Sequence, residues 1–174
     1  MKVEALFKMT YGMYIISTEY EGKKNGQVAN VGGQITDKPA RVSICLNKNN
    51  LTCELVQKRK AFTLAILNED APLKYIGNFG FKSGRDVEKF ENSKYIESKN
   101  FKLPIPTEYT VSYLEAEVEE VQDMGNYCVF IGKVVDADII GEGNPMTYAY
   151  YHKVKGGLTQ KNAPTYVDPK TAKA

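Results

Sequence analysis

Residues 45–52, which read CLNKNNLT, have the side chains that a phosphate site needs. A strand is predicted to end and a helix to begin within this stretch, and the first turn of a helix offers unpaired N–H groups and the positive end of the helix dipole. Lys48 would add a full positive charge, and Asn50 and Thr52 would add neutral hydrogen-bond donors. A helix capped by asparagine on a polar loop explains the same residues. The residues alone leave both interpretations open.

Residues 27–34 form a predicted strand with an unusual number of amides. Gln27, Asn30 and Gln34 carry them, and glycines occupy positions 32 and 33. Amide side chains present both donors and acceptors, which match the mixed edge of a heterocycle, and glycine lets a flat ligand approach the backbone. An ordinary edge strand with its polar face in water is the alternative interpretation.

Two aromatic segments could close a ligand site. Residues 79–86, FGFKSGRD, combine two phenylalanines with a flexible turn, which could cover a flat ligand or form a surface loop. Near the C-terminus the single histidine of the chain, His152, follows Tyr148, Tyr150 and Tyr151. A lone histidine is more often a structural hydrogen-bonding residue than a catalyst, and one histidine excludes a histidine-rich metal site. We therefore predict no metal, and chemistry that depends on a bound cofactor.

The composition fits a single domain that spans residues 1–174. The chain has 43% apolar and 25% charged residues, with 23 Lys+Arg against 21 Asp+Glu, which excludes a disordered chain and gives no electrostatic reason to expect a nucleic-acid partner. Cys45, Cys53 and Cys128 are odd in number and lack C-x-x-C spacing, so buried thiols in a reducing cytoplasm are expected. No segment has the length and apolarity of a signal peptide or a membrane span. We predict a soluble cytoplasmic protein without membrane contacts.

Strands joined by hairpins are predicted to position these residues. β-Branched, aromatic or alternating runs predict six strands, at residues 11–18, 27–36, 41–46, 61–67, 109–121 and 127–140. Helices are predicted at the start of the chain, where Val3, Leu6 and Phe7 form one apolar stripe, from position 49 or 50 to about 60, and from 72 to 79. Hairpins rather than β-α-β units indicate a closed or nearly closed antiparallel barrel.

Two local patterns sharpen this prediction. Asn25-Gly26 is a strong hairpin-turn signal, because both residues accept positive φ, and it predicts the turn before the second strand. The glutamates Glu115, Glu117 and Glu119 alternate along a predicted strand, which indicates a face in contact with water.

The motifs and their order resemble the flavin reductase-like, FMN-binding split-barrel family. The resemblance rests on YGMYIIST at 11–18, NGQVAN at 25–30, QITxxP at 34–39 and NKNNxT at 47–52. FGFKSGRDVEKF at 79–90, YxxYH at 148–152 and APTY at 163–166 are similar to the branch that holds archaeal ferric reductase and the NADH:FMN oxidoreductase portion of high-molecular-weight rubredoxin. The likeness covers nearly the whole chain.

The resemblance implies a mainly β fold with short helices, an antiparallel Greek-key split β-barrel, and a homodimer that binds FMN. It implies an oxidoreductase that takes reducing equivalents from NADH or NADPH and passes them to a ferric, flavin or iron–sulfur acceptor, with a rubredoxin-like protein as one redox partner. The alternative is a flavoredoxin-like electron carrier, with the same fold and FMN but no nicotinamide activity.

The resemblance also implies residue roles. The phosphate would be held at the start of the first long helix, by Asn47, Lys48, Asn50 and Thr52. The ribityl chain and the isoalloxazine ring would be lined, mostly by backbone groups, by Gln27, Ala29, Asn30, Val31, Cys45 and Leu46. Closure over the flavin would come from Phe79, Gly80 and Phe81. The nicotinamide side would be shaped by Tyr127, Tyr151 and His152, where Tyr127 replaces a histidine that many relatives carry after the Asp-x-Gly turn.

Overall fold

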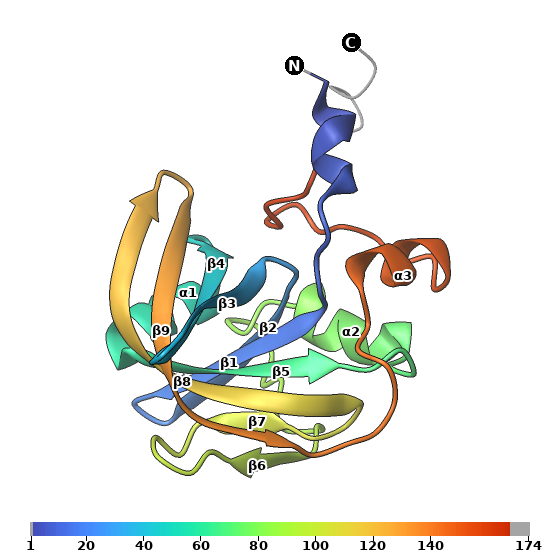
Figure 1. Cartoon of the computed structure of the whole chain (residues 1–174). Helices are drawn as coiled ribbons and strands as arrows, with labels where there is room; N and C mark the ends of the chain where they lie inside the picture. Colours follow the sequence, from blue (N-terminus) through green and yellow to red (C-terminus); the bar gives the residue numbers. More distant parts are fainter. Residues whose placement is uncertain (1, 168–174) are drawn as a thin grey trace.

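The computed structural model of the chain describes residues 2–167, apart from the side chains of Val3, Glu4 and Phe7 (Figure 1). Seven strands form one antiparallel sheet in the order β2-β1-β5-β8-β9-β4-β3. They are β1 (Tyr14–Tyr20), β2 (Lys23–Ala29), β3 (Gly32–Asp37), β4 (Ala40–Asn47), β5 (Ala61–Leu67), β8 (Thr110–Met124) and β9 (Tyr127–Ile139). The mainly β, antiparallel architecture is the one that the sequence predicts.

Short elements complete the fold. A small hairpin of β6 (Tyr95–Glu97) and β7 (Pro104–Pro106) lies below the sheet in Figure 1. The helical segments are η1 (Val3–Lys8), α1 (Leu51–Arg59), α2 (Leu73–Gly80) and α3 (Tyr148–Lys153). The three predicted helices correspond to η1, α1 and α2, whereas α3 was not predicted.

Strands β1 and β5 separate two apolar cores. Ile16 and Leu64 face the barrel interior, where they pack with side chains of β4, β9 and α1. Their neighbours Ile15 and Ala65 face the other way, into a cluster with residues of α2 and α3. A strand that is covered on both faces needs apolar side chains at nearly every position, which explains the continuous apolar runs.

The turn between β1 and β2 differs from the predicted one. It lies at Glu21-Gly22, whose φ angles of 51° and 80° are both left-handed, as a two-residue hairpin requires. Asn25 and Gly26 lie inside β2, opposite Thr18 and Ser17 of β1. The predicted turn at Asn25-Gly26 is therefore wrong, and the side chain of Asn25 becomes available for another role.

Glu115 also differs from its prediction, because its side chain is fully buried while Glu117 and Glu119 are exposed. The Glu115 carboxylate accepts hydrogen bonds from the Ser98 hydroxyl, from the Asn100 backbone and side chain at 3.0 and 2.8 Å, and from the Phe101 N–H at 2.7 Å. Burial alone would raise the pKa of this carboxyl, but the hydrogen bonds outweigh it and hold the pKa below its ordinary value. The carboxylate thus fixes the loop before β7 against β8.

Replacement of Glu115 by alanine should lower the free energy of unfolding by about 3 kcal/mol near neutral pH, because the buried donors lose their acceptor. Since the pKa in the folded protein is lowered, the stabilisation is present above the ordinary glutamate pKa and is lost as the pH falls through the folded-state pKa. Chemical denaturation of wild type and Glu115→Ala should therefore converge in acid. Glu117→Ala, on the same strand, is the control, and an equal loss in both variants would contradict the role of Glu115.

Candidate functional site

A cleft of about 190 Å³ runs along the outer edge of β2. β2 is the last strand of the sheet, so its outer edge pairs with no other strand in the described chain. The walls come from four segments far apart in sequence: β2, the start of α1, the end of α2 with the following loop, and the C-terminal segment at residues 160–162. An uncovered strand edge presents backbone donors and acceptors to whatever lies against it.

The N-terminus of α1 opens into this cleft. Asn50 is the N-cap residue, but its side chain makes no capping hydrogen bond. Its Oδ1 instead accepts a hydrogen bond from Asn162 Nδ2 at 2.8 Å, which ties the C-terminal segment to the helix. The first N–H groups of the nine-residue helix are thus left without a side-chain cap, so they and the helix dipole can attract an anion.

A buried lysine, Lys89, supplies a positive charge to the same cleft. Lys89 is 4% exposed, and its ammonium donates to the carbonyl oxygens of Gly26 at 2.8 Å and Phe79 at 3.0 Å. No carboxylate of the described residues forms an ion pair with it. Burial lowers the pKa of Lys89 to about 8. A buried cation without a counter-ion is a strong site for a bound anion.

Two buried amide oxygens in the cleft lack donors. Asn25 donates through Nδ2 to the Thr52 hydroxyl at 2.8 Å, but within residues 2–167 its Oδ1 has no hydrogen-bond partner, and neither has Oε1 of Gln27. A buried acceptor that is left unpaired costs free energy. A ligand with hydroxyl groups would satisfy both oxygens, so the cleft suits a phosphorylated polyol chain.

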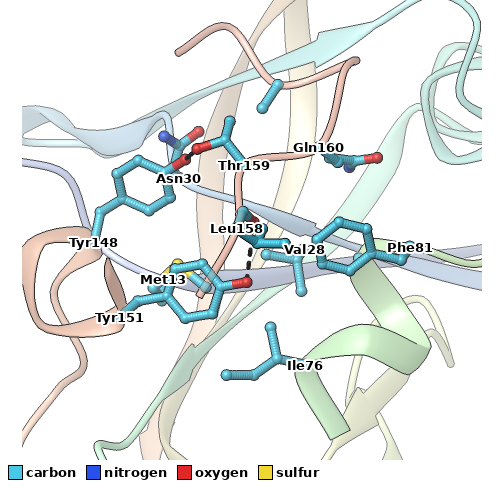
Figure 2. A pocket seen from close by; sticks show the side chains of 12 residues that line it. Met13, Val28, Asn30, Ile76, Phe81, Tyr148, Tyr151, Leu158, Thr159 and Gln160 are labelled. Atoms are coloured by element: carbon cyan, nitrogen blue, oxygen red, sulfur yellow. Dashed lines mark hydrogen bonds between the residues drawn. The ribbon is translucent and has the colours of Figure 1, made fainter. Parts of the chain in front are cut away.

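Beyond Gly80 and Phe81 the site continues into an apolar region (Figure 2). Figure 2 shows Val28, Ile76 and Phe81 around its centre, with Asn30 and two tyrosines on the opposite side. The space between these side chains is only about 30 Å³. Phe81 and Leu158 are 54% and 73% exposed, so little packing holds either side chain in place.

Tyr151 holds the wall of this apolar region in place. Its hydroxyl donates to the Leu158 carbonyl oxygen at 3.1 Å, and Leu158 belongs to the segment that covers the region. Burial raises the pKa of Tyr151, so the hydroxyl keeps the proton that it donates.

The structure gathers about half of the predicted site residues at this cleft. The following line the cleft or its apolar extension: Gln27, Asn30, Asn50, Thr52, Phe79, Gly80, Phe81 and Tyr151. Asn25 and Lys89 line it as well, although neither was predicted as a site residue. Asn25 was predicted to lie in a hairpin turn, so no role in a site was expected for it. For Lys89, the only signal in the sequence was its position inside the 79–90 motif.

The remaining predicted binding residues point elsewhere. The side chains of Ala29 and Leu46 belong to the barrel core. Asn47 accepts a hydrogen bond from the Asn49 N–H at 2.9 Å, and Lys48 pairs with Asp123 at 2.6 Å beside a separate cavity. Val31, just past the end of β2, accepts a hydrogen bond through its carbonyl oxygen from the Cys45 N–H at 3.2 Å, and neither residue lines the cleft or its apolar extension.

The three residues predicted for the nicotinamide side do not come together within one chain. Tyr151 and His152 are neighbours on α3, with ring centroids 5.2 Å apart. Tyr127 pairs with Asn47 at the start of β9. Figure 1 shows the β8–β9 hairpin on the left of the molecule and α3 on the right.

Other classes of site find no support in the described residues. Residues 2–167 contain no group of three or more His, Cys, Asp or Glu placed to hold a metal ion. Nor does this part of the chain contain a helix long and apolar enough to cross a membrane.

Comparison with known proteins gives this geometry a context. The family described as flavin reductase like domain matches residues 6–159. The chain is 45% identical over 166 residues to the high molecular weight rubredoxin of Moorella thermoacetica, which covers 95% of this chain and 72% of that protein. It is 38% identical over 170 residues to the ferric-chelate reductase (NAD(P)H) of Archaeoglobus fulgidus, which covers 98% of this chain and 100% of that protein.

Solved structures agree on the fold. A putative flavin reductase from Haemophilus somnus superposes with a TM-score of 0.74 at 20% identity, over 83% of this chain and 90% of that chain. The flavin reductase HpaC complexed with NADP+ superposes with a TM-score of 0.72 at 22% identity, over 84% and 90%. The predicted split-barrel fold is confirmed.

Lys89 gives the cleft a measurable pH dependence. In the folded chain its pKa is about 8, whereas in the unfolded chain a lysine has a pKa of ~10.4. Between these values the unfolded chain binds the proton and the folded chain does not, so stability rises with pH in this window. The free energy of unfolding of wild type should rise relative to Lys89→Met by about 3 kcal/mol across the window. Lys82→Met, exposed in the neighbouring loop, is the control, and parallel curves for wild type and Lys89→Met would show that Lys89 is not buried.

Proposed function

The chain belongs to the flavin reductase-like domain family, and from this premise we propose that it is an NAD(P)H-dependent flavin reductase of the ferric-reductase type that holds FMN in the cleft along β2. One observation carries the assignment of FMN to the cleft. The cleft contains a buried cation, Lys89, and two buried acceptors without donors among the described residues, the side-chain oxygens of Asn25 and Gln27. Electrons would pass from NADH or NADPH to a ferric, flavin or iron–sulfur acceptor.

The residues of the cleft fit the two polar parts of FMN. Lys89 and the N–H groups at the start of α1 would bind the phosphate, with Asn50 and Thr52 beside it. The unpartnered oxygens of Asn25 and Gln27 would accept hydrogen bonds from ribityl hydroxyls. The bound flavin would accept a hydride, and it would pass on the two electrons of that hydride one at a time or together.

The apolar region would receive the flavin ring. Phe81 would fold over one side of it, and Val28 of β2 and Gly80 at the end of α2 would support it, which keeps water from the reacting face. Asn30 would hydrogen-bond to the polar edge of the ring. Tyr151 would hold the Leu158 segment that closes the region.

A homodimer is part of this proposal. An apolar hollow of about 360 Å³ is lined by side chains of the barrel strands, which include Tyr14, Val42, Leu64 and Leu114. A second copy would cover it and would bring the β8–β9 hairpin of one chain toward its partner. The similarity to a high molecular weight rubredoxin favours a rubredoxin-like redox partner. The cytoplasmic location stays a prediction, supported by three cysteines without disulfides.

Anaerobic mixing tests the reductase function directly. Purified protein loaded with FMN should lose its flavin absorbance when NADH or NADPH is added, and a ferric chelate should restore it. Persistence of the absorbance with both nucleotides would contradict a reductase and leave a flavoredoxin-like carrier.

Comparison of FMN with riboflavin tests the phosphate end. Lys89→Met should weaken FMN by about 100-fold and riboflavin by much less, because one buried charge-assisted contact is worth about 3 kcal/mol. Lys48→Ala is the matched comparison, since Lys48 was also predicted to bind the phosphate but pairs with Asp123. Fluorescence titration gives the dissociation constants of FMN and riboflavin for wild type and for each of the two variants.

The two variants separate the alternatives. A large loss of FMN selectivity in Lys48→Ala alone would assign the phosphate to Lys48, and equal losses for both flavins in Lys89→Met would exclude Lys89 as the phosphate ligand.

A further inference from the structure

An unbroken chain of hydrogen bonds joins His152 on α3 to the cleft. Its links are Asn30 Nδ2 to Thr165 Oγ1 at 2.8 Å, Thr165 Oγ1 to the Tyr148 hydroxyl at 3.2 Å, that hydroxyl to Thr159 Oγ1 at 2.5 Å, and Thr159 Oγ1 to His152 Nε2 at 3.2 Å. One end is a half-buried imidazole beside a groove of about 980 Å³. The other end, Asn30, is 4% exposed in the apolar region proposed for the flavin ring.

The direction of every link follows from the second nitrogen of the imidazole. His152 Nδ1 lies 2.7 Å from the Gly157 carbonyl oxygen, which can only accept, so Nδ1 carries a proton. In the neutral ring Nε2 is then an acceptor, and Thr159 must donate to it. Thr159 in turn accepts from Tyr148, and each preceding hydroxyl has its donor direction fixed in the same way.

At the buried end this order fixes the amide of Asn30. Thr165 has already given its proton to Tyr148, so it can only accept from Asn30, and Nδ2 must face it. The carbonyl oxygen Oδ1 of Asn30 is left for the apolar region. Neutral His152 thus makes Asn30 an acceptor toward a bound ring.

A proton on Nε2 removes the constraint that fixes this order. Doubly protonated His152 donates to Thr159, whose own proton is then free to turn toward Tyr148, and the same reversal can pass along the hydroxyls until Thr165 donates to Asn30. Asn30 would accept from that donor with Oδ1 and turn Nδ2 toward the ring. The reversed order therefore presents the opposite polarity at a buried position.

We infer that His152 is a positioning residue that sets, through this hydrogen-bonded chain, whether Asn30 offers an acceptor or a donor to the flavin ring. The inference rests on the proposed function for the identity of the ring. It gives this chain a means to couple flavin binding to pH in the range where histidine changes charge, between about pH 5 and 8.

Aromatic rings and the open groove surround the imidazole. The rings of Tyr148 and Tyr151 pack against it on α3, with centroids 4.4 and 5.2 Å away. The groove-lining residues described here include no carboxylate that could hold the ring charged. The other ionisable groups of the groove are Lys8 from η1, Tyr11, Lys153 of α3 and Tyr166 of the C-terminal segment.

Nitrogen-15 NMR of the protein without flavin tests the chain itself. The side-chain amide of Asn30 should shift with pH together with the imidazole signals of His152. Tyr148→Phe keeps the ring and removes the linking hydroxyl, so in this variant the imidazole should still titrate while the Asn30 amide no longer responds. Tyr11→Phe, which removes a hydroxyl from the same groove but not from the chain, should keep the response. An Asn30 amide that ignores the titration of His152 in wild type would overturn the inference.

FMN titration between about pH 5 and 8 gives a second measurement. The dissociation constant of wild type should change by about tenfold more across this range than that of Tyr148→Phe, since one hydrogen bond of reversed polarity is at stake. Thr159→Val breaks the chain at another link and should reproduce the flat profile. Identical profiles for wild type and both variants would overturn the inference. Failure of FMN to bind at any pH would contradict the proposed function instead, and the NMR result would still decide the role of His152.

Discussion

The ammonium of Lys89 joins the outer edge of β2 to the end of α2, and the cleft depends on this contact. It bonds to the carbonyl oxygens of Gly26 and Phe79, which come from opposite walls. An open strand edge would otherwise be a template for pairing with another chain. Lys89 occupies part of that edge while it keeps a charge that carboxylates of the described chain do not neutralise. The same group thus protects the sheet and prepares an anion site, and its lowered pKa reflects the burial that both roles require.

Few titratable side chains are needed around such a site. The chain has one histidine, and apart from Lys82 and Lys89 the described part of the cleft and its apolar extension contributes mainly amides, hydroxyls and aromatic rings. This set is suited to binding and orientation, which is what an enzyme contributes when a cofactor supplies the redox chemistry. In the hydrogen-bonded chain that ends at Asn30, the single histidine acts by selecting the orientation of an amide.

The sequence predicted what depends on local patterns and missed what depends on distant partners. The helix α1 begins at the predicted position because Asn50 and the apolar stripe that follows it are local signals. The Asn25-Gly26 turn signal is just as strong, but the register of β1 with β2 and the hydrogen bond from Asn25 to Thr52 prevail over it. Lys89 lies in a polar segment and looks like a surface lysine, because the carbonyl of Gly26 that buries it is 63 residues away. The antiparallel barrel was predicted from the strand patterns and hairpins, whereas the binding roles of Gln27, Asn50 and Thr52 were preferred over the alternatives only through the order of motifs along the whole chain.

The C-terminal segment has a consequence for the order of folding. The hydrogen bond between Asn50 and Asn162 joins residues that are 112 positions apart in the sequence, and the one between Asn30 and Thr165 joins residues 135 positions apart. These two contacts therefore close the longest loops of the site. Loop closure costs more entropy as the loop lengthens, and contacts of long sequence separation form slowly. Half of the strand pairings in the sheet join consecutive strands, and even the pairing of β4 with β9 spans fewer residues than either of these contacts, so the barrel can assemble without them. A folding chain therefore has a complete barrel before it has a cleft, and the last step of folding is also the first moment at which it can retain a flavin.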